Sequence, residues 1–310
     1  MAGYLGLDTS NYTTSAAYIA ADGVITQSKQ LLPVKEGEMG LRQSDAVFHH
    51  TRQLPERLEE LASCLQQGVC AVAASDRPQQ QEGSYMPCFL VGAGAARQLG
   101  AALGVPVHLF THQQGHVMAA LVGSDSLSLL GRPFLAFHVS GGTTDALLVE
   151  TDETSFIRCR VVGRSLDLKA GQLIDRVGGM LSLAFPAGPA LERLAAQSTG
   201  TYRVRPTLRG SDCHLSGVEN QCRDRLQRGD PPAEIARFCM EHVKAAVDGM
   251  TQSLLTTYGD LPLVYAGGVM SNAMLREYFG QRYGGRFAPP SYSADNAVGI
   301  AYLCRLAQEG

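Results

Sequence analysis

Two histidines four residues apart have the spacing of a metal-binding pair. His112 and His116 stand in the segment H-Q-Q-G-H, which in a helix places both imidazoles on one face with Cβ atoms about 5 to 6 Å apart. Such nitrogens can share a divalent metal. The glutamate of the H-E-x-x-H metalloproteases is absent, so the base that activates water for peptide hydrolysis is missing from its usual place. A pair of this kind can equally be structural, and the spacing alone leaves both interpretations open.

Two short polar turns are candidates for phosphate binding. The first follows a strand and consists of Asp8, Thr9 and Ser10, and the second consists of Val139, Ser140, Gly141, Gly142 and Thr143. Residues this small allow backbone N–H groups to close around phosphate oxygens while hydroxyls also donate. Either turn alone could be an ordinary hairpin. Their pairing indicates two phosphate loops and an internally duplicated chain.

A third glycine-rich turn follows the last clear strand. Gly267 and Gly268 stand where that strand would deliver the chain into a helix, so a ligand could lie against the backbone and face the helix N–H groups. Asn272 can cap the helix or contact a ribose or base. A pair of glycines after a strand is often only a packing turn, and its functional interpretation depends on the two hairpins.

The elements that would position these residues alternate between strands and helices. Strands are predicted over 4–8, 13–19, 24–31, 69–74, 105–110, 134–139, 145–150 and 262–266. Helices are predicted over 44–67, 89–103, from about 112, from about 272 and from about 294, with mostly helical patterns over 166–258. Pro55 should start or kink the first helix, and Asp76 to Pro87 should form an irregular loop. The order predicts an α/β fold that opens with antiparallel strands.

The composition excludes several classes of protein. With 310 residues, 45% of them hydrophobic and 18% charged, the chain can bury a large core and form two lobes. A net charge of −3 provides no global basic field, so a nucleic-acid partner would need a local patch. Arginines cluster at 203, 205 and 209 and again at 223, 225 and 228, and we interpret both clusters as solvated surface.

Cysteine spacing and the apolar segments indicate a cytoplasmic protein. The eight cysteines include no C-x-x-C pair, which argues against a zinc ribbon and is consistent with reduced thiols. The amino terminus has no basic region followed by an apolar stretch, so no secretion signal is expected. The longest apolar region, 89–110, is interrupted by polar residues and glycines and falls short of a membrane span, so we expect no membrane association.

Several segments, in the same order, resemble the tRNA threonylcarbamoyladenosine transferase family, once called O-sialoglycoprotein endopeptidase. D-T-S-N-Y-T-T at Asp8 is similar to that family's E-T-S-C-D-E-T, H-Q-Q-G-H to its H-x-x-G-H, and V-S-G-G-T-T to its V-S-G-G-H-T. L-D-L-K-A-G-Q-L-I-D-R at Leu166 and F-P-A-G-P at Phe185 resemble its D-x-x-A-G-x-x-x-D-K and Y-P-G-G-P segments. A-G-G-V-M-S-N, together with A-D-N-A at Ala294, completes a resemblance that spans nearly the whole chain.

The resemblance implies the duplicated two-lobe, α/β fold of actin, sugar kinases and heat-shock chaperones, with nucleotide held in the cleft. The expected division is an N-terminal lobe over 1–108 and a C-terminal lobe over 109–310, with the last helix, about 294–310, packing back on the first lobe. It also implies one iron or zinc ion on His112, His116 and Asp295. Contacts to ATP, ADP or an acyl-adenylate would come from Val139 to Thr143, Asp175, Gly188 and Asn272, beside the turn at Gly267 and Gly268.

The implied activity is acyl transfer, in which a threonylcarbamoyl or related carbamoyl group moves from an adenylate to adenosine of tRNA. The implied partners are nucleotide, tRNA and the family's partner subunits, or a second copy of the chain.

The chain also departs from the family pattern. Tyr12 and Thr13 replace an acidic pair, Thr143 replaces a histidine, Arg176 a lysine, Ala187 a glycine, and Asp76 to Pro87 a glycine-proline-glycine loop. These departures suggest a divergent paralogue. They raise the alternative of a non-catalytic or ATPase-type regulator of a true transferase, and a metallopeptidase is a further and weaker alternative.

Overall fold

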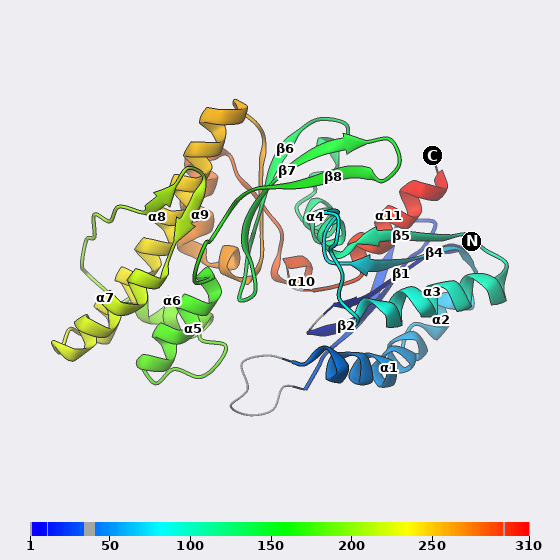
Figure 1. The fold of residues 1–310 in the computed structure, drawn as a ribbon, viewed down its shortest axis with the longest axis horizontal. Helices are drawn as coiled ribbons and strands as arrows, with labels where there is room; N and C mark the ends of the chain where they lie inside the picture. The colour runs from blue at the N-terminus through cyan, green and yellow to red at the C-terminus, as the bar shows by residue number, and fades with distance from the viewer. Residues whose placement is uncertain (1, 11, 34–40, 294, 310) are drawn as a thin grey trace. The chain divides into compact units, whose positions relative to one another are not determined.

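The computed structural model describes residues 2–10, 12–33, 41–293 and 295–309 (Figure 1). The chain forms two compact units. The first consists of Met1–Arg132, Glu150–Cys159 and Ser291–Gly310, and the second of Pro133–Val149 and Arg160–Pro290. Within the described residues, no helix combines the length and the apolar character needed to cross a membrane.

A five-stranded sheet with the order β3-β2-β1-β4-β5 organises the first unit. Its strands are β1 (Gly3–Ser10), β2 (Thr13–Ile19), β3 (Ile25–Leu31), β4 (Val69–Arg77) and β5 (Val107–Thr111). The helices of this unit are α1 (Gln43–Glu59), α2 (Ala62–Leu65), α3 (Phe89–Leu103), α4 (His112–Gly123) and α11 (Val298–Glu309), with the 3-10 turn η1 (Leu127–Leu129). Alternate residues of β1 and β2 pack against α1 and α3 on one face and against α11 on the other, so the sheet is buried on both sides.

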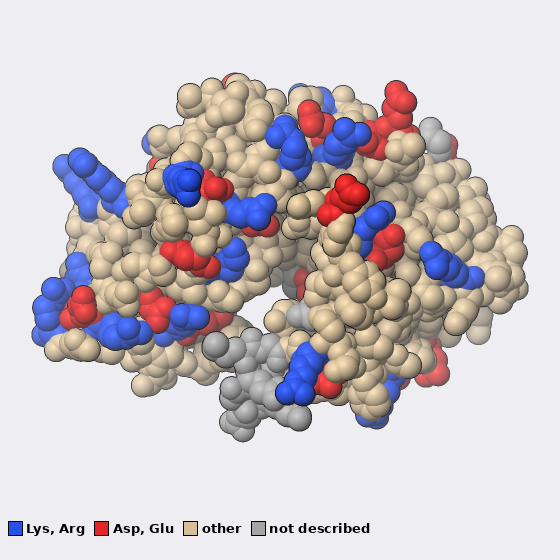
Figure 2. Space-filling model, in the orientation of Figure 1, with Lys and Arg blue, Asp and Glu red and all other residues tan. Residues whose placement is uncertain are grey.

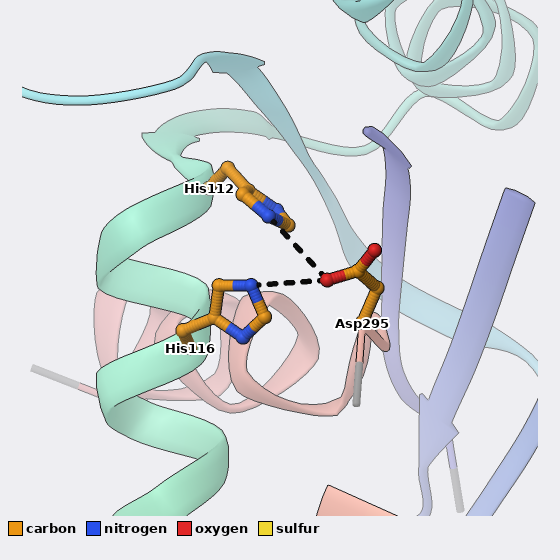
Figure 3. A group of neighbouring side chains, drawn as sticks. All are labelled: His112, His116 and Asp295. Atoms are coloured by element: carbon orange, nitrogen blue, oxygen red, sulfur yellow. Dashed lines mark ion pairs between the residues drawn. The ribbon is translucent and has the colours of Figure 1, made fainter. Parts of the chain in front are cut away.

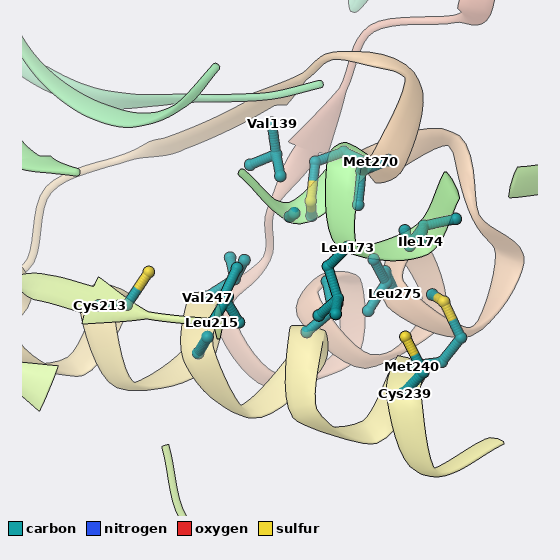
Figure 4. Close-up of a cluster of buried hydrophobic side chains, with 14 of the residues drawn as sticks. Val139, Leu173, Ile174, Cys213, Leu215, Cys239, Met240, Val247, Met270 and Leu275 are labelled. Carbon is teal, nitrogen blue, oxygen red and sulfur yellow. The ribbon is translucent and has the colours of Figure 1, made fainter. Parts of the chain in front are cut away.

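The sheet of the second unit has the order β12-β11-β6-β7-β8. Its strands are β6 (Phe134–Val139), β7 (Thr144–Asp152), β8 (Phe156–Arg164), β11 (Leu263–Ala266) and β12 (Arg286–Phe287), although Glu150–Cys159, at the end of β7 and the start of β8, is counted with the first unit. A separate pair is formed by β9 (Thr207–Arg209) and β10 (Asp212–His214). The helices are α5 (Ala170–Met180), α6 (Gly188–Ala195), α7 (Ser216–Gln227), α8 (Pro232–Tyr258) and α9 (Ala273–Tyr283), followed by α10 (Pro290–Ser293), with η2 (Gly268–Ser271) after β11. The core of this unit packs residues of α5, α8 and α9 against β6 (Figure 4).

The two sheets repeat one topology. In each, the first strand pairs antiparallel with the next strand and parallel with a strand that follows much later, as β1 does with β2 and β4, and β6 with β7 and β11. The strand orders are therefore equivalent, with β1 to β5 corresponding to β6, β7, β8, β11 and β12. The α/β class and the duplication expected from the two polar turns are confirmed.

Some predicted elements differ from the structure. Pro55 lies inside α1 and neither starts nor ends it, and the predicted long helix divides at Glu60 instead. The last helix begins at Val298 and not near 294, because the Asn296 side chain accepts the backbone N–H of Val298 and caps it there. The strands β8, β9, β10 and β12 were not predicted. The last three have only two or three residues, too few for a periodic signal, whereas β8 has nine residues and was missed although it is long enough.

The boundary of the first compact unit also differs from the expected division between 108 and 109. The first segment of this unit continues to Arg132, since α4 packs along α11. The last helix, α11, contacts β1, β2 and β4.

Candidate metal centre and ligand pocket

The first residues of the candidate metal centre lie in α4, which begins directly after β5 ends. Thr111 caps this helix through a reciprocal pair, in which its hydroxyl accepts the N–H of Gln114 at 3.2 Å and its own N–H donates to the Gln114 side chain at 2.9 Å. The helix is therefore fixed at its first turn. His112 is its first residue and His116 lies one turn further, so both side chains project from the same face, as the spacing predicts.

His112, His116 and Asp295 come together in the first unit (Figure 3). Their ligand atoms lie within 4.8 Å of one another. The Nε2 atom of His116 is 3.2 Å from Oδ1 of Asp295, and Nε2 of His112 is 3.8 Å from the same oxygen. All three side chains are partly accessible, with exposed fractions between 10% and 26%. A ligand could therefore reach this group from solvent.

Asp8 orients the first histidine. Its buried carboxylate accepts a hydrogen bond at 3.0 Å from Nδ1 of His112 and another from the hydroxyl of Ser75. An ionised carboxylate can only accept, so the proton of the ring lies on Nδ1 and Nε2 is left for a metal. Burial lowers the pKa of His112, but the adjacent Asp8 carboxylate outweighs it and raises the pKa to about 9. Metal binding would therefore have to compete with a proton.

Two glycines bring Asp295 to the histidines. A Cβ atom at Gly299 would collide with the backbone of Gly115, and a Cβ at Gly115 would press on Ile300. The axes of α4 and α11 can cross this closely only because both positions lack side chains. Asp295 precedes α11 by three residues and is carried to His116 by this contact. The glycine of H-Q-Q-G-H is thus explained by helix packing.

The donor set fits a transition metal. Two imidazole nitrogens and one carboxylate oxygen suit zinc or iron, and a second carboxylate holding the ring of one histidine is the usual support of such sites. Three protein ligands would leave at least one coordination position for water or substrate. A metal held by these three residues would therefore have an open position, unlike the metal of a closed structural site.

The first hairpin uses most of its polar side chains inside its own unit. The Thr9 hydroxyl donates to the carbonyl of Cys88 and accepts the N–H of Gly92, both at 3.0 Å, so its one proton is not free to donate to a phosphate. The hydroxyl of Ser10 is buried without a hydrogen-bond partner among the described residues. Thr13 donates to Oδ2 of Asp295 at 3.3 Å. These contacts link the hairpin to the metal centre.

The predicted nucleotide residues gather around one pocket of the second unit. The pocket has a volume of about 480 Å³. Among its lining residues are Gly141, Asp175, Gly188, Gly268 and Asn272. The glycine loop, two helices and the turn after β11 thus contribute to one concave surface, which is the usual form of a small-molecule site.

Two polar side chains of the pocket are already oriented by the backbone. Asp175 accepts the N–H of Ala187 at 2.8 Å through one oxygen, and burial raises its pKa although this hydrogen bond lowers it. Asn272 caps α9 by accepting the N–H of Leu275 at 3.2 Å, which leaves its amide N–H groups to donate to a ligand. The sequence left two interpretations of Asn272, a helix cap or a ligand contact. The two are compatible, because the side-chain oxygen caps the helix while the amide N–H groups can donate to a ligand.

The other predicted residues of these turns support the loops. Val139 is buried in the core, and the N–H of Ser140 donates to the carbonyl of Thr143 at 2.7 Å to close the turn. Gly267 has φ +97° and a Cβ there would collide with the backbone of Val139, so this glycine is required by packing. At Gly141 and Gly142 a Cβ would meet no atom within 4 Å, which leaves open space beside the loop.

Sequence reasoning missed two residues of the pocket, and it missed the role of Asp8 at the metal centre. Glu192 lines the pocket and accepts the N–H of Ala273 at 2.7 Å, and Met240 of α8 contributes an apolar wall. The position of Glu192, one helical turn after Gly188, was the available signal. The role of Asp8 in holding His112 had no sequence signal, because the two residues are 104 positions apart.

Comparison with protein families gives one description for most of the chain. The model of the tRNA N6-adenosine threonylcarbamoyltransferase family matches residues 30–302. A protein of that name from Methanopyrus kandleri is 28% identical over 98% of this chain and 87% of its own length. Another from Aromatoleum aromaticum is 32% identical over 82% of this chain and 75% of its own length.

Solved structures share the fold at low identity. Component A of the (R)-2-hydroxyglutaryl-CoA dehydratase of Acidaminococcus fermentans superposes with a TM-score of 0.60 and 16% identity, covering 100% of both chains. The ROK hexokinase of Thermus thermophilus gives a TM-score of 0.51 and 18% identity, covering 99% of this chain and 100% of its own. Together with the repeated sheet topology, these likenesses show the duplicated actin and sugar-kinase fold.

Proposed function

This chain belongs to the tRNA N6-adenosine threonylcarbamoyltransferase family, and on that premise we propose that it is an acyltransferase. The proposed reaction moves a threonylcarbamoyl or related carbamoyl group from its adenylate to adenosine of tRNA. The observation that carries the proposal is the convergence of His112, His116 and Asp295 on one point, with Asp8 fixing the ring of the first. The family match supplies the reaction, and this geometry supplies a centre suited to it.

The metal is proposed to be one iron or zinc ion held by His112, His116 and Asp295. When bound, it would supply a Lewis acid for a carbonyl oxygen of the donor. Two neighbouring residues orient the proposed metal ligands. Asp8 keeps the proton of His112 on Nδ1, and Thr13 donates to Oδ2 of Asp295. Removing either hydrogen bond would leave all three metal-binding side chains in place but would hold His112 or Asp295 less firmly.

The pocket of the second unit is proposed to hold the nucleotide part of ATP, ADP or the acyl-adenylate. Its apolar walls suit a base, the open glycine loop suits phosphate oxygens, and Asp175 and Asn272 can pair with ribose or base. Val139 to Thr143, Gly188, Gly267 and Gly268 complete the proposed set. The phosphate role of Asp8, Thr9 and Ser10 has less support, because the contacts of Asp8 and Thr9 are made within their own unit.

A second candidate function is a non-catalytic or ATPase-type regulator of a true transferase. It is favoured by Tyr12 and Thr13, which provide no carboxylate beside the metal centre to orient an acceptor or take its proton. A metallopeptidase is weaker, because Gln113 occupies the place of the required glutamate. The protein is further proposed to be cytoplasmic. Its proposed partners are tRNA and either the family's partner subunits or a second copy of the chain.

The deciding experiment supplies the purified chain with threonylcarbamoyl adenylate, tRNA and the family's partner subunits, and quantifies modified adenosine by mass spectrometry of the nucleosides. A parallel sample with ATP alone measures phosphate release. Modified adenosine that depends on His112, and disappears in His112→Ala, supports the transferase. Phosphate release without modified adenosine, at any enzyme concentration tested, would favour the regulator instead.

A further inference from the structure

The two arginine clusters assigned to solvated surface differ in their surroundings. In the cluster at 223, 225 and 228, every arginine has an acidic partner. Arg223 pairs with Glu219 at 2.9 Å, Arg225 with Asp230 at 2.8 Å, and Arg228 approaches Asp230 at 3.9 Å. Figure 2 shows blue and red side chains next to one another around α7, at the lower left. Most of this charge is therefore neutralised locally.

The side chains of the arginines in the other cluster form no ion pair or hydrogen bond with any described residue. Arg203, Arg205 and Arg209 are all exposed. From Tyr202 to Arg209 the exposure alternates strictly, so that odd positions are exposed and even positions are half-buried. Tyr202, Val204 and Leu208 pack against the core of the second unit.

This alternation orients the three guanidinium groups alike. In an extended chain successive side chains point to opposite faces, and each residue advances about 3.3 Å. Arg203 and Arg205 therefore lie on one outer face about 7 Å apart, and Arg209 follows about 13 Å further along. The segment is held at its end, because β9 pairs with β10. The result is an anchored row of positive charge.

Few acidic groups oppose this row. Asp212 stands opposite Arg209 in the β9–β10 ladder, but one of its oxygens accepts the N–H of Arg164 at 2.8 Å. Opposite Thr207 stands His214, which adds no negative charge. Glu234 accepts hydrogen bonds from the hydroxyls of Tyr202 and Ser198, on the core side of the segment. A second carboxylate, Asp167, lines a pocket together with Arg205, but it accepts hydrogen bonds from Leu215 and Ser216 and lies 3.4 Å from His214. Three guanidinium groups thus face solvent, and the two carboxylates near them, Asp167 and Asp212, already have other partners.

We propose that the outer face of residues 203–209 is a docking surface for the phosphodiester backbone of RNA. Guanidinium groups pair with phosphate oxygens through two parallel hydrogen bonds, and a row of them follows a polyanion better than isolated charges would. The chain as a whole carries a net charge of −3, so binding of RNA has to rely on such a local patch. That the RNA is tRNA rests on the proposed function. The docking surface itself rests on the arginines.

The test compares two triple variants that remove the same charge. Arg203→Ala, Arg205→Ala and Arg209→Ala are combined in one protein, and Arg158→Ala, Arg223→Ala and Arg228→Ala in the other. Arg158, which pairs with Asp152 at 2.9 Å, takes the place of Arg225, because Arg225 stacks on the ring of Tyr202. Binding of unmodified tRNA is titrated by fluorescence anisotropy at several salt concentrations. The first variant should bind at least about tenfold more weakly at low salt, and its salt slope should fall by about 2 to 3, as expected for the loss of three phosphate contacts. The second should stay within about twofold of the wild type.

Two further variants sharpen the result. Lysine at 203, 205 and 209 keeps the charge and should retain most of the affinity, which a purely structural role of the arginines would not predict. Asp212→Asn keeps an acceptor for the N–H of Arg164 but removes the opposing charge, so it should bind tRNA about twofold to threefold more tightly. Circular dichroism and a melting curve check that each variant is folded.

Several outcomes would overturn the proposal. They are a wild-type chain that does not bind tRNA at low salt, equal losses in both triple variants, and transfer with an unchanged KM for tRNA in the 203/205/209 variant. Failure of the proposed function is distinguishable from these. A chain that binds tRNA through these arginines but never modifies it would keep the docking surface and lose the transferase.

Discussion

The β1–β2 and β6–β7 hairpins occupy equivalent places in two sheets of the same strand order, but their polar residues act differently. The first is tight, with Ser10 paired to Thr13, and its side chains turn to neighbours in its own unit, Asp8 to His112 and Thr13 to Asp295. The second leaves four residues between the paired Val139 and Thr144. Its glycines have open space beside them, and Gly141 lines the pocket.

The difference shows how a duplicated fold acquires two kinds of site. A turn of small polar residues can bind a ligand through its backbone only if that backbone is left uncovered, as at Gly141. Where the side chains are long enough to reach neighbouring elements, as at Asp8, the same turn instead orients other functional residues. The length of the connection, two residues between Ser10 and Thr13 but four between Val139 and Thr144, therefore separates a support for the metal centre from a proposed phosphate loop.

The largest expected effect concerns the first hairpin. Replacing Tyr12→Asp and Thr13→Glu together should raise the rate of adenosine modification by about 10²- to 10⁴-fold over a slow wild type, the usual contribution of a general base. Turnover is measured with adenylate donor, tRNA and partner subunits. Metal content should stay the same or rise, because a new carboxylate at position 13 would lie beside Asp295. Wild-type turnover as fast as that of a full family member would show that the acidic pair is dispensable and would end the divergent-paralogue interpretation.

The next effect concerns the second hairpin. Gly141→Val should weaken binding of ATP and ADP by about 100-fold, equivalent to ~2.7 kcal/mol, because the new side chain would fill space beside the loop that the phosphates need. The protein should remain folded, since a Cβ at this position meets no atom within 4 Å. Calorimetry measures both nucleotides.

Gly142→Val is the matched control for that change. It lies on the same loop with the same open space but does not line the pocket, so its effect should be smaller. If a folded Gly141→Val protein kept its nucleotide affinity, the phosphate-loop proposal would have to be abandoned.

The third effect concerns Asp8, the residue of the first hairpin that contacts His112. Asp8→Asn should lower metal affinity about 10- to 100-fold, since a neutral amide, whose NH2 can also donate to Nδ1, fixes the ring less firmly than a carboxylate and makes it a weaker ligand. This loss should outweigh the weaker competition from protons that a lower pKa of His112 would bring. Elemental analysis after purification without chelator, followed by competition with a chromogenic chelator, gives the affinity. Asp145→Asn, which alters a carboxylate of the second hairpin, should leave it unchanged. An equal loss in both variants would argue against a special role for Asp8.

The smallest effect concerns the cap of α9 at the pocket. Asn272→Ala should lower the free energy of unfolding by about 1 kcal/mol, because the N–H of Leu275 loses its acceptor. Asn272→Asp keeps the cap, so urea unfolding should show little change, but it adds negative charge beside Asp175 and should weaken nucleotide binding. Unaltered nucleotide affinity in the Asp variant would limit Asn272 to capping.

Periodicity predicted the long elements well and the short ones poorly. The helix over 89–103 was predicted to the residue, because its apolar pattern ends at a glycine with left-handed φ, Gly104. Pro55 misled the prediction of the first helix, since proline is tolerated inside α1 at the cost of one backbone hydrogen bond. The three-residue strands β9 and β10 are too short for any period to be visible.

The sequence by itself determined the family and the duplicated α/β order, and it predicted which side chains could hold a metal. It did so because histidine spacing, glycine turns and strand patterns are local properties of the chain. Only the tertiary structure decided that Asp8 holds His112, that the glycine at 115 admits α11, and which arginines remain unpaired. Each of these depends on residues far apart in the chain meeting in space. Helix packing and strand pairing bring these residues into contact, and a local sequence pattern cannot predict such contacts.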